Sequence, residues 1–131
     1  MKWIEQGKAL LEKAAQDEFV VDKLMADPSS PQEVIGFHLE QATEKLFKAA
    51  LSFSQIPFPR THQLQVLISL LRKHGKVIPE EFNGFLELAP FAVDFRYDML
   101  PEEKRQEEQG NFADDRELVK KLRKWVEEMA E

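Results

Sequence analysis

The sequence predicts an all-α fold, an up-and-down bundle of four to five helices in a single domain over residues 1–131. Apolar residues recur at three- and four-residue steps along most of the chain, as in amphipathic helices packed on a core. Proline-containing and turn-forming segments interrupt these stripes. No segment alternates as a strand does, and a 131-residue chain that is 43% hydrophobic is sufficient for one core.

The first helix is expected over residues 2–25, where an apolar stripe runs from Trp3 to Met25. Residues 27–30, Asp-Pro-Ser-Ser, then favour a turn. Ser30 is predicted to cap the second helix, with Pro31 at its first position. The core stripe of that helix consists of Ile35, Leu39, Ala42, Leu46, Ala49 and Phe53.

The second helix also carries Gly36, Thr43, Phe47 and Leu51 on another side, which predicts a central helix with more than one neighbour. It should end before residues 56–59, Ile-Pro-Phe-Pro, because two prolines remove backbone donors and force extended conformations.

A third helix of about four turns is predicted from the cap residue Thr61 to a stop at Gly75. Its core stripe is Leu64, Leu67, Ile68 and Leu71. A fourth helix should run from Pro79 to about Tyr97, with a kink at Pro90. Its apolar residues are Phe82, Phe85, Leu86, Ala89, Ala92 and Val93.

Residues 98–113 form the most polar stretch, and the sequence leaves open whether they are a mobile loop or an exposed helical extension. Asp114 and Glu117 resemble a capping arrangement for the last helix. The apolar face of that helix is Leu118, Leu122, Trp125, Val126 and Met129.

Composition excludes several classes of protein. The chain has no cysteine, which rules out disulfides, thiolate metal sites and a cysteine nucleophile. No apolar run approaches the ~20 residues that cross a bilayer, and no signal-peptide pattern opens the chain, so a cytoplasmic protein without membrane association is expected. A net charge of −6 argues against extended nucleic-acid binding, which needs many lysines and arginines on phosphates.

The second helix carries a polar face as regular as its apolar one. His38, Gln41, Lys45 and Lys48 follow three- and four-residue steps, and Glu44 lies at the edge of this face. The more common interpretation is a solvated helix face on which Glu44 and Lys48 form an i,i+4 ion pair of ~0.3–0.5 kcal/mol. The alternative is a site for an anionic ligand.

Two further positions combine polar residues with a helix end. His62 follows Thr61 at a helix start, where backbone N–H groups can receive a phosphate, although simple capping with an exposed His62 is slightly favoured. Arg96 falls on the apolar side of the fourth helix and needs a carboxylate, carbonyl or phosphate partner. Tyr97 can stack on a base or cover the core.

The remaining polar residues predict no catalytic or metal site. The three histidines lack the spacing of metal ligands, so neither a metal nor another cofactor is expected. The chain has no Walker sequence and no Gly-x-Ser-x-Gly elbow.

Five segments form a pattern along the chain: Trp3, residues 37–49 (Phe-His-Leu-Glu-Gln-Ala-Thr-Glu-Lys-Leu-Phe-Lys-Ala), Thr61-His62-Gln63-Leu64, Arg96-Tyr97 and Trp125. In order and spacing, these segments together resemble the HEPN domain family. The resemblance covers nearly the whole chain, and residues 41–49 are its most specific part. It implies a helical bundle that is often dimeric. It also implies nucleotide or RNA biology, because members accompany minimal nucleotidyltransferases, occur in toxin–antitoxin pairs or act as ribonucleases.

The chain departs from the ribonuclease members, which carry a histidine four to six positions after an arginine. No histidine follows Arg96, so the resemblance is to the non-nuclease branch and an enzyme is not predicted, unless folding brings His38 or His62 near Arg96. The hypothesis is a nucleotide-associated module that binds an ATP-like ligand, forms a homodimer and partners a minimal nucleotidyltransferase. Its candidate nucleotide- or phosphate-binding residues are Gln41, Lys45, Lys48, His62, Arg96 and Tyr97. The alternatives are an RNA-cleaving, metal-independent toxin with an unusually placed histidine and a ligand-free structural dimer.

Overall fold

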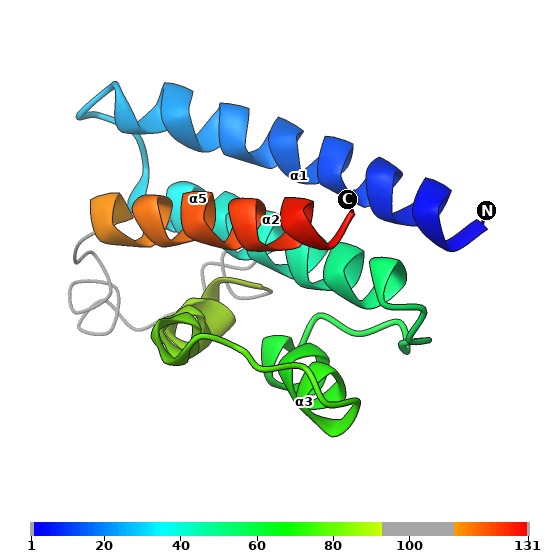
Figure 1. Cartoon of the computed structure of the whole chain (residues 1–131). Helices are drawn as coiled ribbons and strands as arrows, with labels where there is room; N and C mark the ends of the chain where they lie inside the picture. Colours follow the sequence, from blue (N-terminus) through cyan, green and yellow to red (C-terminus); the bar gives the residue numbers. More distant parts are fainter. Residues whose placement is uncertain (1, 93–111, 131) are drawn as a thin grey trace.

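The computed structural model describes residues 2–92 and 112–130, and all regular elements in these ranges are helical (Figure 1). They are α1 (Lys2–Met25), α2 (Gln32–Phe53), α3 (Leu64–Lys73), the 3-10 helix η1 (Glu80–Ala92) and α5 (Phe112–Met129). α1 and α2 run antiparallel, α5 lies along α2, and α3 and η1 lie below them in this view. α2 contacts each of the other helices, which confirms the all-α class and the central helix.

The turn between α1 and α2 corrects the predicted helix cap. α1 ends at Met25 as expected, and the Oδ1 atom of Asp27 accepts hydrogen bonds from the N–H and hydroxyl of Ser29. Ser30 is not the cap of the next helix, because α2 begins at Gln32 with Pro31 at the cap and no side-chain capping bond. Proline suits this position because its extended backbone leads into the helix and it has no N–H to satisfy.

Close approach to α2 depends on two glycines. A Cβ atom on Gly7 of α1 would lie 2.5 Å from a ring carbon of Phe53. A Cβ atom on Gly36 of α2 would likewise lie 2.5 Å from the ring of Phe91 in η1. Real Cβ atoms do not approach carbon so closely, so a side chain at either position would displace a phenyl ring.

The segment between α2 and α3 stops the helix where the prolines predict it. Gln55 adopts a φ of 58°, and the N–H of Ile56 donates to the carbonyl of Leu51 at 2.9 Å. The predicted cap at Thr61 is wrong, because α3 begins only at Leu64 and the Thr61 hydroxyl accepts from the N–H of Gln63 in the turn before it. α3 therefore has ten residues and is shorter than four turns, with its predicted stripe buried.

The fourth helical segment differs from the prediction in type and in buried face. η1 is a 3-10 helix that contains Pro90, and it is described as far as Ala92. It buries every third side chain: Phe82, Phe85, Leu88 and Phe91. That spacing matches the three residues per turn of a 3-10 helix, so Leu86 and Ala89 of the predicted stripe are exposed instead. Residues 93–97 lie outside the described ranges.

α5 begins at Phe112, two residues before the predicted capping residue Asp114, which instead falls in the first turn. Phe112 packs its ring on Phe91 at 5.7 Å between centroids, and this contact favours the earlier start. Of the expected polar segment 98–113, residues 98–111 lie outside the described ranges.

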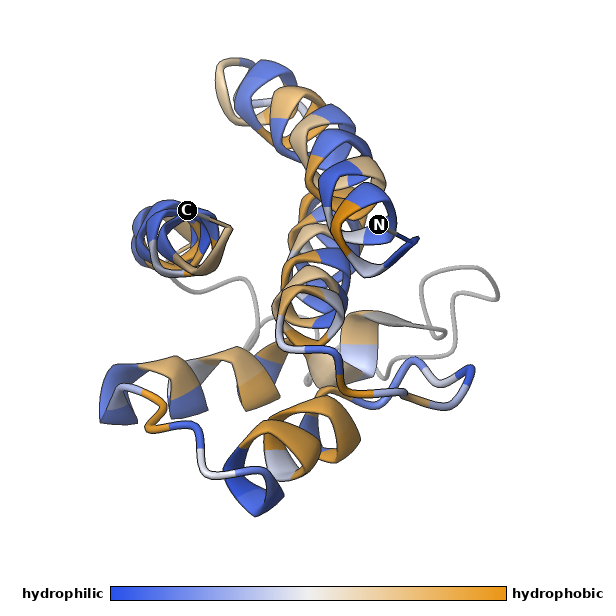
Figure 2. Cartoon of the chain, turned by 45° about the vertical axis from the view of Figure 1, so that its right-hand side comes forward, coloured by the Kyte–Doolittle hydropathy of each residue, from blue (hydrophilic) through white to orange (hydrophobic). Residues whose placement is uncertain are grey.

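The helices surround an aromatic and aliphatic core. Phe47, Phe82 and Phe85 contact one another, and Trp125 of α5 packs edge-on against Phe82. Figure 2 shows hydrophobic residues of α3 and η1 gathered beneath α2. Within the described ranges, no helix is both long and apolar enough to span a membrane.

Candidate functional site

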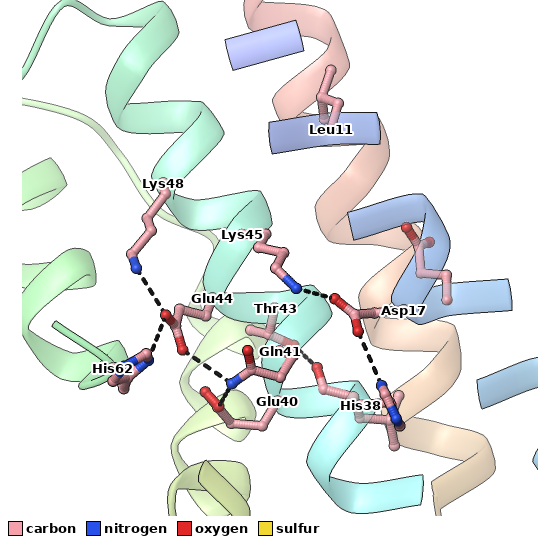
Figure 3. A network of polar contacts seen from close by, with 12 residues as sticks. Leu11, Asp17, His38, Glu40, Gln41, Thr43, Glu44, Lys45, Lys48 and His62 are labelled. Atoms are coloured by element: carbon pink, nitrogen blue, oxygen red, sulfur yellow. Dashed lines mark hydrogen bonds and ion pairs between the residues drawn. The ribbon is translucent and has the colours of Figure 1, made fainter. Parts of the chain in front are cut away.

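A buried carboxylate, Glu44, organises polar side chains on α2 (Figure 3). The Nζ atom of Lys48 donates to its Oε1 atom at 2.8 Å, and the Nδ1 atom of His62 lies 2.9 Å from the same oxygen. The amide of Gln41 donates to the other oxygen at 3.5 Å and to Glu40 at 3.3 Å. We call Glu40, Gln41, Glu44, Lys48 and His62 the Glu44 cluster. It connects α2 with the segment that precedes α3.

The two carboxyl groups of this cluster differ in protonation. Burial, reinforced by the adjacent Glu44 carboxylate, raises the pKa of Glu40 to about 9, so Glu40 is neutral at pH 7. Burial opposes ionisation of Glu44 too, but interactions with Glu40, Lys48 and His62 outweigh it and hold its pKa below the usual value. The Oε1 atom of Glu40 is buried without a hydrogen-bond partner among the described residues. The cluster thus holds one negative charge beside Lys48.

A second polar cluster lies between α1 and α2. Asp17 of α1, which is buried, accepts from the Nζ atom of Lys45 at 2.5 Å and lies 3.0 Å from the Nδ1 atom of His38. We call these three residues the Asp17 cluster. Figure 3 shows it on the side of α2 that faces α1, whereas His62 approaches Glu44 from the other side. The polar face of α2 is therefore divided between two acidic partners.

Comparison with known proteins assigns the family. The family model for the HEPN domain matches residues 1–131. The chain belongs to the HEPN domain family. Searches of curated proteins and of solved structures gave no significant match. Membership makes this chain a nucleotide-related module or one that binds or cleaves RNA, and the family match does not distinguish between these activities.

The structure of this HEPN chain brings together only some of the predicted site residues. Gln41, Lys48 and His62 meet around Glu44. Lys45 instead contacts Asp17 on the other side of the α2 face. Arg96 and Tyr97 lie outside the described ranges.

The Glu44–Lys48 pair is not the solvated surface pair that the helix pattern alone favours. Its side chains are 4% and 16% exposed, whereas the His62 side chain is 69% exposed. Because the Glu44 carboxylate engages Nδ1 of His62, the ring N–H faces the carboxylate and Nε2 remains for a ligand. In this arrangement Lys48 can donate to an anionic group, and His62 can do so from Nε2 when its imidazole carries a proton on both nitrogens.

Two acidic residues of the site, Asp17 and Glu40, are not among the residues predicted from the sequence. Asp17 stands between Ala14 and Val21 on the apolar stripe of α1, and a carboxylate in such a stripe needs a buried partner. Glu40 lies four residues after Gly36 and four before Glu44, on the side of α2 that is buried. Both signals can be read from helical spacing.

No group of three or more histidine, cysteine, aspartate or glutamate side chains within the described ranges is arranged to hold a metal ion.

Proposed function

We propose that this HEPN chain is a nucleotide-associated binding module, formed by residues 1–131 as one domain. It would serve as the partner or substrate-binding subunit of a minimal nucleotidyltransferase in a toxin–antitoxin-like system. The observation that supports it best is the convergence of Lys48 and His62, from separate elements, on the buried Glu44. Glu44 holds both groups in place, which lowers the entropy lost when they bind a ligand.

A nucleotide phosphate would bind at the open side of the Glu44 cluster. Lys48 would donate to its oxygens, and His62 would donate from Nε2 when its imidazole is doubly protonated. Gln41 would donate as well if its amide turned from Glu40 or Glu44 toward the phosphate. The neutral Glu40 favours this ligand, because a second carboxylate charge beside Lys48 would repel phosphate. Lys45 and Arg96 are proposed to add positive charge, and Tyr97 to stack on the base.

The proposed partners follow from the surface of the chain. A net charge of −6 favours a basic protein partner, because complementary charge accelerates association and orients the complex. Ile4 and Phe19 of α1 are exposed apolar side chains, 43% and 61% exposed, and support α1 as part of a homodimer interface.

Calorimetric titration with ATP, GTP and short RNA tests the proposal. Lys48→Met should weaken nucleotide binding at least about tenfold, the loss expected when one charge-assisted hydrogen bond is removed. Arg96→Ala and Lys45→Ala should weaken it as well. Lys124→Met, which changes an exposed lysine of α5, is the matched control. Circular dichroism must show each variant folded. Absence of nucleotide binding by a folded, dimeric wild type would favour a structural scaffold.

The geometry at His62 also favours a second candidate function, metal-independent RNA cleavage. A carboxylate that engages Nδ1 of an exposed histidine is the arrangement of a general base, since it fixes the tautomer and leaves Nε2 for proton transfer. RNA cleavage by the wild type that is abolished by His62→Ala would establish this activity. Unchanged cleavage in His62→Ala would indicate a contaminating nuclease.

A further inference from the structure

A pocket of about 310 Å³ lies between the start of α1 and the proline-rich segment after α2, and its lining is largely apolar. Its lining residues are Lys2, Trp3, Gln6, Pro57 and Phe58. Trp3 and Phe58 are each partly exposed, so their ring surfaces are accessible to a ligand. A pocket with two aromatic side chains, one amide and one ammonium matches a planar, polar-edged ring better than an aliphatic chain.

The pocket and the Glu44 cluster are connected through α2 and through the segment that follows it. The hydroxyl of Ser52 lies 2.7 Å from the carbonyl oxygen of Trp3 and 3.0 Å from the Oε1 atom of Gln6. Ser52 follows Lys48 by four residues on α2, which is a rise of about 6 Å. Phe58 precedes His62 by four residues, a separation of at most about 14 Å. A ligand of nucleotide length can therefore span both places.

We propose that this pocket is the base-binding subsite of the nucleotide site, with the base against Trp3 and Phe58 and the phosphates at Lys48 and His62. This inference rests on the proposed function. The side chain of Gln6 is held near Ser52, and an amide that lines the pocket can pair with donors or acceptors on a base edge. Aromatic stacking binds any base through its π-face, and Lys2 at the rim favours an anionic ligand.

Trp3 itself can report the binding. The chain has two tryptophans, so Trp125→Phe leaves Trp3 as the sole indole, and Trp125 packs against Phe82 in the core rather than in the pocket. In this background, adenosine and ATP should quench Trp3 fluorescence, whereas inorganic tripolyphosphate should bind by calorimetry with little quenching.

Phe58→Leu should weaken the affinity for ATP about fivefold or more and leave the affinity for tripolyphosphate unchanged. Phe58→Tyr, which keeps the ring, should retain ATP affinity.

The outcomes separate this inference from the proposed function. Tripolyphosphate binding without adenosine quenching, together with unchanged ATP affinity in folded Phe58→Leu, would refute the base subsite and leave the phosphate site standing. Adenosine quenching that Phe58→Leu abolishes, without any binding of tripolyphosphate, would support the base subsite and refute the phosphate site.

Discussion

Replacing Glu40 by glutamine should make the stability of the protein less dependent on pH. Folding raises the pKa of Glu40 from 4.5 to about 9, chiefly through burial. Between these values the unfolded chain has lost a proton that the folded chain keeps, so wild-type stability falls by up to about 1.36 kcal/mol per pH unit as the pH rises. The pKa of Glu44 is lowered on folding, so its contribution changes below pH 4.5 and not in this window. Glutamine has nearly the same shape and no proton to lose, so the variant lacks the part of the slope that Glu40 contributes.

Urea unfolding at about pH 5.5 and about pH 7.5 measures this effect. The stability of Glu40→Gln relative to wild type should increase by about 2–3 kcal/mol between the two conditions. Glu12→Gln, which changes an exposed glutamate of α1, should follow the wild type, because its carboxylate stays in water on folding. Parallel pH dependences for wild type and Glu40→Gln would refute a protonated Glu40.

Three further substitutions test the packing and ion pairs. Gly36→Ala should destabilise the fold by about 1–3 kcal/mol in chemical denaturation, because its Cβ would overlap the ring of Phe91. Asp17→Asn should lose about 1–3 kcal/mol, and a double-mutant cycle with Lys45→Met should reveal the coupling between the two side chains. Arg123→Met should lower the thermal midpoint by several degrees, because it removes hydrogen bonds from α5 to α1.

Two controls make these results specific. Gly84→Ala places its Cβ in ordinary contact at 3.4 Å from Leu118, so it should cost much less than Gly36→Ala. Equal losses at both glycines would contradict the tight contact with η1. Lys124→Met should leave the thermal midpoint near that of wild type. If Arg123→Met lowers the midpoint no more than Lys124→Met does, the hydrogen bonds of Arg123 do not stabilise the fold.

The sequence predicts the helices well and their caps poorly. Residues that repeat at 3.6-residue spacing are buried in α2 and α3 because that spacing is the geometry of the helix itself. Caps depend on which of several adjacent residues takes the extended conformation, and tertiary contacts decide this. Pro31 displaces Ser30 at α2, and the contact of Phe112 with Phe91 accompanies the earlier start of α5.

In the 3-10 helix η1 the α-helical period of 3.6 residues predicts the wrong buried face. Phe82, Phe85, Leu88 and Phe91 repeat every third residue, and this pattern is visible in the sequence. An α-helical period instead assigns Leu86 and Ala89 to the core. Pro90 is a further signal, because it removes the backbone donor that an α-helix would use.

The candidate site could be predicted in part. Helical spacing places Gln41 and Lys48 on one face of α2 and pairs Lys48 with Glu44, but the helix pattern does not determine that this pair is buried. His62 reaches Glu44 only because the proline-rich segment folds back along α2, which is a tertiary contact. Asp17 reaches Lys45 across the α1–α2 interface for the same reason. Contacts between different elements therefore could not be predicted from the pattern of each helix alone.

The most direct test of the proposed function is the affinity of ATP for folded wild type and Lys48→Met, measured side by side by calorimetry. If the Glu44 cluster is a phosphate site, ATP should bind saturably to the wild type and at least about tenfold more weakly to Lys48→Met. Equal affinities in the two proteins, or no binding to wild type, would contradict a nucleotide site at this cluster.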